Sequence, residues 1–273
     1  MAVIRRIRNS PDEGAAYDMH VHTTASDALI SPKDLAKYLN KKHMSCAVTD
    51  HNVISGVKKT LEYADIIPGI EISASEGPHL LVYFERYSDL ETYYLDKIRD
   101  KRTLCPHLAT KLGTEEIIES AKNAGGLVVA AHPYGYGIAV RGVMKGIATG
   151  VLPESAADNL DGLEVLCSGL TRGCNRCAEN FAAEHNLCMT GGSDAHVLWD
   201  AGFSVSVGSA GARPSEMLEE IRQKKTQVAG MERNFARKAV QGLCMTPLYI
   251  PWLFPLLYTH MQQHILRIKS MMK

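Results

Sequence analysis

The sequence predicts an α/β protein in which parallel strands alternate with helices. From Tyr17 onward, short runs of apolar and β-branched residues alternate with longer stretches whose apolar residues have helical spacing. This gives roughly seven or eight strand–helix units before the alternation stops near residue 232. Histidine and acidic residues stand at the ends of most strands, where parallel α/β folds place their functional groups. The alternation alone favours a closed barrel only modestly over an open, doubly wound sheet.

Local signals define the first elements. YDMHVH, which begins at Tyr17, predicts a strand. Ser31 suits the N-cap of a helix, Pro32 suits its first turn, and Asp34 follows three residues after the cap. We therefore expect a helix through LAKYLNKKHM, then a strand at SCAVTDH and a second helix at VISGVKKTLEYA.

The remaining elements continue the same alternation. The expected strands are ADIIPGIEIS, HLLVYFE, GLVVAAHP, DGLEVLC, NLCMTGGSD and FSVSVGS. The expected helices are DLETYYLDKIRDKR, TEEIIESAKNAG, TRGCNRCAENFAAEHN and RPSEMLEEIRQKK. We expect one barrel-sized domain over residues 1–231, followed by a mostly helical or irregular C-terminal extension over residues 232–273.

Composition narrows the function classes. The chain has 273 residues, 45% of them hydrophobic, and its 30 basic and 30 acidic residues cancel. The balance argues against long duplex DNA or an anionic membrane as a partner, whereas a small nucleotide remains compatible with it. Seven cysteines and an N-terminus, MAVIRRIRNS, unlike a secretory signal predict free thiols and a cytoplasmic location.

One apolar segment, LCMTPLYIPWLFPLLY at residues 243–258, is about as long as a bilayer is wide. It contains Pro247, Pro251 and Pro255, which disfavour a continuous membrane helix. We therefore expect no transmembrane segment and predict a buried or partner-facing segment that caps the domain or joins copies of the chain in a homo-oligomer. Interfacial membrane contact is the alternative.

The polar residues at the strand ends form the main functional signal. His20 and His22 are two residues apart, so both side chains lie on one side of a strand, and Asp194 and His196 have the same spacing. Parallel strands bring their carboxyl ends to one face, so these residues should converge; His79, which opens its strand, is the exception. The candidates are His20, His22, Asp27, His51, Glu71, His79, His132, Asp194 and His196.

Such a cluster requires cations, because imidazoles and carboxylates gathered in one cleft repel one another. Imidazole and carboxylate ligands suit manganese, iron or zinc, and no thiolate is present at these positions. The donors exceed the needs of one ion, so about two or three divalent transition metal ions are expected. His260 and His264, four apart in the extension, lack a third ligand nearby and are not assigned to a metal.

The motifs DMHVH, TDHN, GIEIS, AAHPYG and GGSDAH resemble, in order and type, those of the PHP (polymerase and histidinol phosphatase) family of metal-dependent phosphoesterases. The resemblance covers roughly residues 16–230. It implies a distorted seven-stranded β/α barrel with a trinuclear metal site at the carboxyl ends of the strands. It assigns one ion to His20, His22, Glu71 and Asp194, a second to Glu71 as a bridge with His79 and His132, and a third to Asp27, His51 and His196.

The finer resemblance concerns the first and last motifs. Some PHP members have histidine where Asp27 stands; the version here looks like the subgroup that includes small phosphodiesterases acting on nucleotide 3′,5′-bisphosphates and 5′-to-3′ RNA-trimming enzymes. The family's usual SDG is SDA in this chain, which keeps the ligand Asp194 and loses the glycine after it.

The leading prediction is hydrolysis of a phosphate ester of a small molecule or short nucleotide by a metal-bridged hydroxide, since coordination lowers the pKa of water from about 15.7 toward about 7. Arg141, Arg172 and Arg176 are candidates for binding phosphate, with Arg172 preferred because PHP relatives often carry an arginine after this strand. Asp18 and Asp50 are candidates for an outer shell or a direct catalytic role. The alternatives are a 5′-to-3′ exonuclease that trims RNA or DNA ends, and a non-catalytic PHP interaction module.

Overall fold

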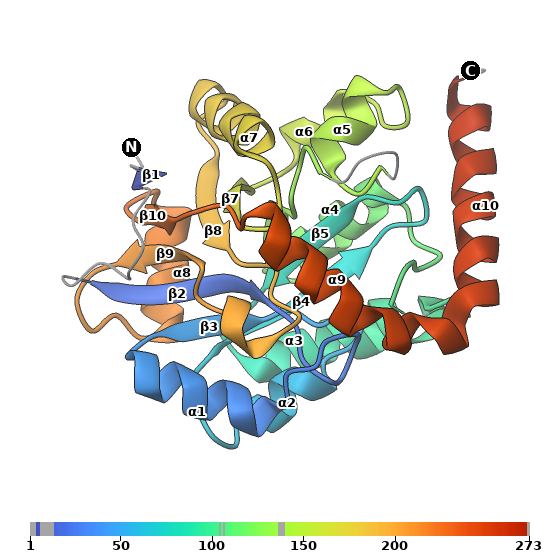
Figure 1. Ribbon diagram of the computed structural model, residues 1–273. Helices are drawn as coiled ribbons and strands as arrows, with labels where there is room; N and C mark the ends of the chain where they lie inside the picture. Colours follow the sequence, from blue (N-terminus) through green and yellow to red (C-terminus); the bar gives the residue numbers. More distant parts are fainter. Residues whose placement is uncertain (1–3, 6–13, 104, 106, 136–139, 272–273) are drawn as a thin grey trace.

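A mixed sheet forms a nearly closed barrel in the computed structural model, which describes residues 4–5, 14–103, 105, 107–135 and 140–271 (Figure 1). The strands are β1 (Ile4–Arg5), β2 (Ala15–Val21), β3 (Ser45–Val48), β4 (Ile67–Ser73), β5 (His79–Tyr83), β6 (Leu127–Ala130), β7 (Gly162–Cys167), β8 (Cys188–Gly192), β9 (Ser204–Gly208) and β10 (Gln227–Gly230). Their order is β1-β10-β9-β2-β3-β4-β5-β6-β7-β8. Because β8 at one end of this order also packs against β9 and β10, the sheet curls back on itself. The predicted α/β barrel is confirmed.

The strands are not all parallel, which corrects the sequence-based expectation. β2, β3 and β4 are parallel, as are β6, β7 and β8, but β5 is antiparallel to both of its neighbours. The β4–β5 connection, residues 74–78, is too short for the crossover of a dozen or more residues that a parallel pair needs. As a result, the first residue of β5, His79, pairs with Ser73 at the end of β4. The apparent exception in the sequence pattern therefore lies at the same end as the other candidates.

Helices surround the barrel. They are α1 (Pro32–Lys42), α2 (Ser55–Thr60), α3 (Tyr87–Tyr93), α4 (Thr114–Asn123), α5 (Val143–Ala148), α6 (Ser155–Asp158), α7 (Arg172–Glu184), α8 (Pro214–Arg222), α9 (Phe235–Tyr249) and α10 (Leu253–Met271). The expected cap of α1 is confirmed, since the Ser31 hydroxyl accepts a hydrogen bond of 3.1 Å from the Asp34 backbone amide. The short helices α5 and α6 were not expected, because each spans too few residues to show a period.

The core has two layers that follow from the alternation of side chains along each strand. In β5, Leu80 and Val82 join the layer between the sheet and the outer helices, whereas Leu81 and Tyr83 join the cluster inside the barrel. The Tyr83 hydroxyl donates a hydrogen bond of 2.7 Å to the Met19 carbonyl within that interior. Helix α8 also contributes apolar side chains to the interior cluster, so the core fills the barrel below the polar strand ends.

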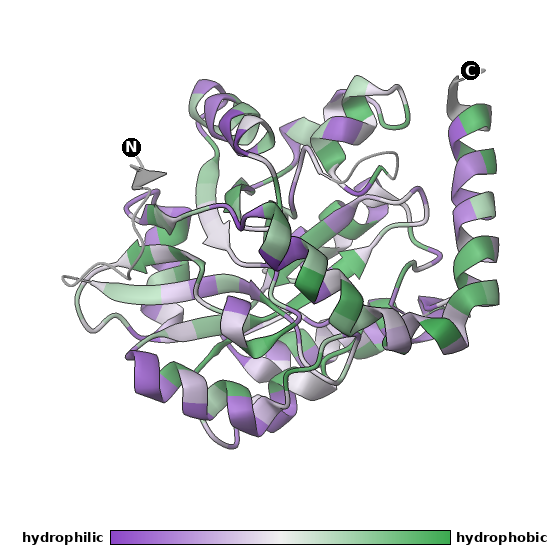
Figure 2. Ribbon diagram, in the orientation of Figure 1, coloured by the Kyte–Doolittle hydropathy of each residue, from purple (hydrophilic) through white to green (hydrophobic). Residues whose placement is uncertain are grey.

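The C-terminal extension packs differently. In Figure 1, α9 crosses the front of the barrel and α10 stands at its side. One expectation was that the segment 243–258 is buried, but much of it is exposed. Phe254 and Leu257 are 81% and 57% exposed, whereas the polar residues Thr259 and Gln263 are buried. Figure 2 shows hydrophobic residues along both helices.

The residues Phe235–Ile268 together meet the length and composition of a membrane-spanning helix. The expected absence of a membrane span, the expected self-association and the domain boundary at residue 231 stay predictions.

Candidate metal centre

The structure brings the nine predicted donors together at one end of the barrel. Strand β2 carries His20, β4 carries Glu71 and β5 begins with His79. The segments after β2, β3, β6 and β8 carry His22, Asp27, His51, His132, Asp194 and His196. Eight of these side chains are buried and His196 is partly buried. The convergence follows from strand direction, because the carboxyl ends of the parallel strands and the start of the antiparallel β5 meet at this end.

Donor atoms converge on a first position beside β2 and β4. His20 Nε2 lies 3.0 Å from His22 Nε2 and 3.1 Å from Glu71 Oε2. His22 Nε2 lies 3.2 Å from the same Glu71 oxygen and 3.4 Å from Asp194 Oδ1. Lone pairs at such distances repel unless a proton or a metal ion lies between them. Two imidazoles and two carboxylates around one point match the ligand set of a divalent transition metal.

Glu164 fixes the orientation of His20, and the sequence-based prediction missed it. The His20 ring places Nδ1 3.1 Å from Glu164 Oε1. A proton on Nδ1 donated to this carboxylate leaves Nε2 unprotonated and aimed at the first position, which is how outer carboxylates hold metal-binding histidines. The other oxygen, Glu164 Oε2, accepts a hydrogen bond of 2.7 Å from the His132 backbone amide. A signal was available, since Glu164 is the one charged residue in the otherwise apolar GLEVLC of β7.

Glu71 extends the cluster to a second position through its other oxygen. His79 Nδ1 lies 2.9 Å and His132 Nε2 lies 3.1 Å from Glu71 Oε1. His51 Nδ1 lies 3.1 Å from Glu71 Oε2. The two oxygens of one fully buried carboxylate therefore face different imidazoles, which is the arrangement of a bridging ligand.

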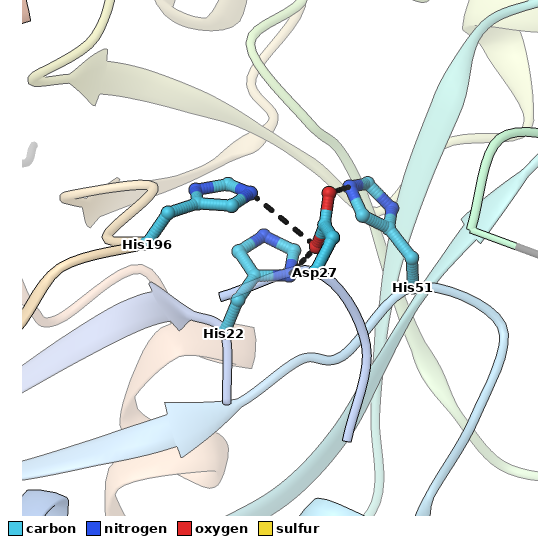
Figure 3. Close-up of side chains that lie close together, drawn as sticks. All are labelled: His22, Asp27, His51 and His196. Carbon is cyan, nitrogen blue, oxygen red and sulfur yellow. Dashed lines mark ion pairs between the residues drawn. The ribbon is translucent and has the colours of Figure 1, made fainter. Parts of the chain in front are cut away.

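A third group surrounds Asp27 (Figure 3). His196 Nε2 lies 3.5 Å and His22 Nδ1 lies 4.0 Å from Asp27 Oδ1, while His51 Nε2 lies 3.9 Å from Asp27 Oδ2. One ligand atom from each of the four residues lies within 4.8 Å of the others. His22 and His51 each offer one nitrogen here and the other to the Glu71 side, so the groups share ligands.

The cluster fits metal ions on two further grounds. In the described part of the chain, His22 Nδ1, Asp27 Oδ1 and His51 Nδ1 are buried without a hydrogen-bond partner, and such orphaned atoms are costly unless something binds them. Burial opposes ionisation of Glu71, yet His51, His20 and His79 hold its pKa well below the usual range. The Glu71 carboxylate thus stays charged, and in the described part of the chain its ion pairs within 4.0 Å are to histidine side chains.

The backbone around the donors is constrained. Asp194 and His132 have φ angles of 52° and 30°, a left-handed conformation that non-glycine residues rarely adopt. Such strain is typical of functional sites, where surrounding structure enforces it. Gly192 before this turn is required for packing, because a Cβ there would lie 2.4 Å from the Cβ of His20.

Comparisons with known proteins agree with this fold. A family model described as PHP-associated matches residues 173–226. A two-domain protein from Bacteroides vulgatus that contains a predicted PHP-like metal-dependent phosphoesterase has a TM-score of 0.56 and 17% identity, over 83% of this chain and 69% of its own. The chain thus has a PHP-like fold, and the match to the PHP-associated family model covers residues 173–226.

Other solved structures share the fold. A candidate metal-dependent phosphoesterase from Bifidobacterium adolescentis has a TM-score of 0.51 and 20% identity, over 83% of this chain and 99% of its own. The lesion-specific endonuclease EndoQ from Pyrococcus furiosus has a TM-score of 0.62 and 19% identity, over 78% of this chain and 57% of its own. At these identities the likeness shows the fold alone.

Two curated relatives match parts of the chain. An uncharacterized protein of Methanocaldococcus jannaschii is 27% identical over 134 residues, which are 43% of this chain and 67% of the relative. The 5′-3′ exoribonuclease Rnm of Salmonella typhimurium is 35% identical over 65 residues, 21% of this chain and 22% of the relative.

Asp18 and Asp50 lie behind the donor cluster. Asp18 accepts hydrogen bonds from the backbone amides of Ser193, at 2.8 Å, and Gly202, at 2.7 Å. Asp50 accepts from the Thr23 amide at 2.7 Å and the Ser26 hydroxyl at 2.7 Å, and so fixes the loop that carries Asp27. Burial raises the pKa of Asp18 to about 6, although these hydrogen bonds act in the opposite direction and lower it. Both residues are fully buried and neither lines the cleft, which favours the outer-shell role expected from the sequence. A direct catalytic role for either residue stays a prediction.

The three candidate arginines occupy different places. Arg141 is 8% exposed, lines a cleft of about 570 Å³ above the cluster and lies 3.4 Å, through Nη1, from His79 Nε2. Burial lowers the pKa of Arg141 to about 10 and so leaves it charged at neutral pH. Arg172 and Arg176 lie exposed on α7 and do not line this cleft. The geometry therefore favours Arg141 over the preferred Arg172, whose role stays a prediction.

Proposed function

We propose that this protein is a PHP-type metal-dependent phosphoesterase that hydrolyses a phosphate ester of a small molecule or short nucleotide. The observation that carries the proposal is Glu71, whose two oxygens face separate sets of imidazoles at 2.9–3.2 Å in a fully buried cluster. A carboxylate shared in this way suits a site with more than one ion. About two or three ions of manganese, iron or zinc fit the donors, and these ligands do not choose among the three metals.

Bound ions and the side chains of the protein would have separate roles in the reaction. Bound ions would supply positive charge that acidifies water and neutralises phosphate oxygens. Glu164 orients His20, and Asp50 holds the loop of Asp27, so the ligand set is fixed before substrate arrives. Arg141 presents a fork of N–H donors at the wall of the cleft, which suits a phosphate oxygen pair.

A small substrate is supported by the cleft and by the charge of the chain. The cleft has a volume of about 570 Å³, which lies within the range of about 300–1,000 Å³ for small-ligand pockets in proteins. The side chains of Leu108 and Met245 supply apolar walls, and Arg141 and Lys238 supply cations. The formal net charge is zero, whereas tracking a long phosphate backbone requires a basic groove.

A second candidate function is trimming of RNA ends from the 5′ side. One observation favours it, the 35% identity to the 5′-3′ exoribonuclease Rnm, which is limited to 65 residues. A non-catalytic PHP module is disfavoured, because all nine donors are present and converge.

The test is turnover by purified protein loaded in turn with manganese, iron and zinc. A generic phosphate ester should be hydrolysed, and Asp194→Asn, which removes a charged donor, should reduce the rate by more than about 100-fold. A nucleotide 3′,5′-bisphosphate compared with a 5′-labelled oligonucleotide then separates the two enzyme functions. Absence of turnover on all three substrates, in protein that has bound metal, would contradict both and favour the non-catalytic module.

A further inference from the structure

The C-terminal extension forms part of the wall of the metal cleft. Helix α9 contributes Met245 and Tyr249 to its lining, and α10 contributes His260. Met245 is 5% exposed, in contrast to Leu243, two residues earlier on the same helix, which is 73% exposed. The side of α9 that faces the cleft is therefore packed, although much of the extension is exposed to solvent.

Tyr249 reaches a predicted metal ligand directly. Its hydroxyl donates a hydrogen bond of 2.7 Å to Asp27 Oδ2. The other oxygen, Asp27 Oδ1, has no hydrogen-bond partner and faces His196 and His22. The tyrosine thus determines which carboxylate oxygen remains free to coordinate. A hydrogen bond to the second oxygen of a ligating carboxylate is the usual way in which proteins orient such a ligand.

His260 makes a second contact between the extension and the site. Its Nε2 lies 3.5 Å from Arg141 Nη2, while Arg141 Nη1 lies 3.4 Å from both His79 Nε2 and the Leu108 carbonyl oxygen. In the described part of the chain, the Arg141 side chain thus contacts two imidazole nitrogens and a carbonyl oxygen, and none of these three atoms carries a negative charge. Its charge is available to a ligand anion in the cleft.

We propose that the extension is a functional part of the active site: Tyr249 positions Asp27 for metal binding, and the wall made by Met245, Tyr249 and His260 restricts the cleft to substrates that end inside it. The ligand class is a phosphate ester of about mononucleotide size, with an apolar or flat group against Met245 and Leu108. The substrate part of this proposal rests on the proposed phosphoesterase function, whereas the metal-positioning part does not.

The positioning role is tested by metal affinity, without turnover. Tyr249→Phe keeps the ring and removes the hydroxyl, so competition against a chelator should show manganese binding about 10–100-fold weaker at one class of site. The matched control is Tyr258→Phe in the same extension, whose hydroxyl accepts a hydrogen bond from Gln262 and whose side chain is 50% exposed. This control should bind manganese as the unaltered chain does. If Tyr249→Phe and Tyr258→Phe bind manganese with equal affinity, the positioning role of Tyr249 is overturned. If the unaltered chain binds manganese but turns over no substrate, the proposed phosphoesterase function alone is overturned.

The wall is tested by ligand length. Calorimetry should show that the unaltered, calcium-loaded chain binds a nucleotide 3′,5′-bisphosphate more tightly than a 5′-phosphorylated oligonucleotide. Met245→Ala opens the wall and should shift this ratio about tenfold toward the longer ligand, whereas Leu243→Ala, on the exposed side of α9, should leave it unchanged. Thermal melts of both variants confirm that each is folded. An unchanged ratio in folded Met245→Ala would show that the extension does not limit substrate length.

Discussion

The barrel and the C-terminal extension distribute polar and apolar side chains in opposite ways. In the barrel, strands such as β6 are fully buried and apolar, and the predicted metal donors gather at one end, where they contact one another. In the extension, Phe254 and Leu257 are mostly exposed while Thr259 and Gln263 are buried. The barrel is therefore stabilised by its core, whereas the extension leaves much of its apolar surface exposed.

The polar contacts of the extension are concentrated near the cleft. Arg233 and Arg237 both bind Asp200, which is fully buried, and the Arg237 Nε–Asp200 Oδ1 distance is 2.7 Å. Tyr249 adds the hydrogen bond to Asp27. The site therefore has a rigid half, made by strand ends, and a half whose position depends on a few hydrogen bonds and ion pairs. Substitutions in each half should have different effects.

The largest effect is expected in the rigid half. Glu71→Gln removes the charge that several imidazoles share, so both metal content and phosphoesterase activity should fall by more than about 100-fold. Elemental mass spectrometry and turnover measure the two quantities on one sample. A variant that retained its metal ions would show that Glu71 is not the bridge between the positions.

Core and extension should also differ in stability. Leu81→Ala inside the barrel should lower the free energy of unfolding by about 2–5 kcal/mol, because it leaves a cavity in a fully buried cluster. Leu257→Ala, in the exposed extension, should change it by less than about 0.5 kcal/mol. Urea denaturation of each variant gives both values. A large loss for Leu257→Ala would mean that another copy of the chain or another surface covers this residue.

Metal loading should stabilise the folded chain. Ions that bind only the folded state at about 100 times their dissociation constant add about 2.7 kcal/mol to the free energy of unfolding. The gain should be visible as a higher melting temperature with manganese than with a chelator. In Asp194→Asn the gain should be smaller, and an equal gain there would place the stabilising ion elsewhere.

A smaller effect separates the candidate arginines. Arg141→Lys keeps the charge and loses the planar fork, so kcat/KM should fall about tenfold. Arg172→Lys, at an exposed position outside the cleft, should leave kcat/KM within about twofold. The opposite ranking would restore the sequence-based preference for Arg172.

The donors of the site could be predicted from the sequence because the pattern of apolar residues shows where the strands end. Alternating apolar runs locate the strands, and the residue at each carboxyl end must then lie on one face. The sequence pattern did not predict the direction of β5. The short connection 74–78 could have done so, because it is too short to join two parallel strands. The donor set needed only the positions of the strand ends, so it did not depend on the closure of the sheet.

The site residues that were not predicted from the sequence depend on contacts between segments that are far apart in the chain. Tyr249 meets Asp27 across 222 residues, and no spacing rule relates the two positions. Glu164 could have been suspected from its place in an apolar strand, but its partner His20 lies 144 residues away. The outward-facing side chains of residues 243–258 were expected to be buried because apolar composition normally predicts burial.

The central claim is that several metal ions bind the cluster around Glu71. Crystals grown with manganese and measured on both sides of its absorption edge test this most directly. We expect two or three anomalous peaks, each within about 2.0–2.3 Å of imidazole nitrogens or carboxylate oxygens among the nine donors. A map with no peak in the cluster, from crystals that hold manganese elsewhere on the chain, would contradict the account.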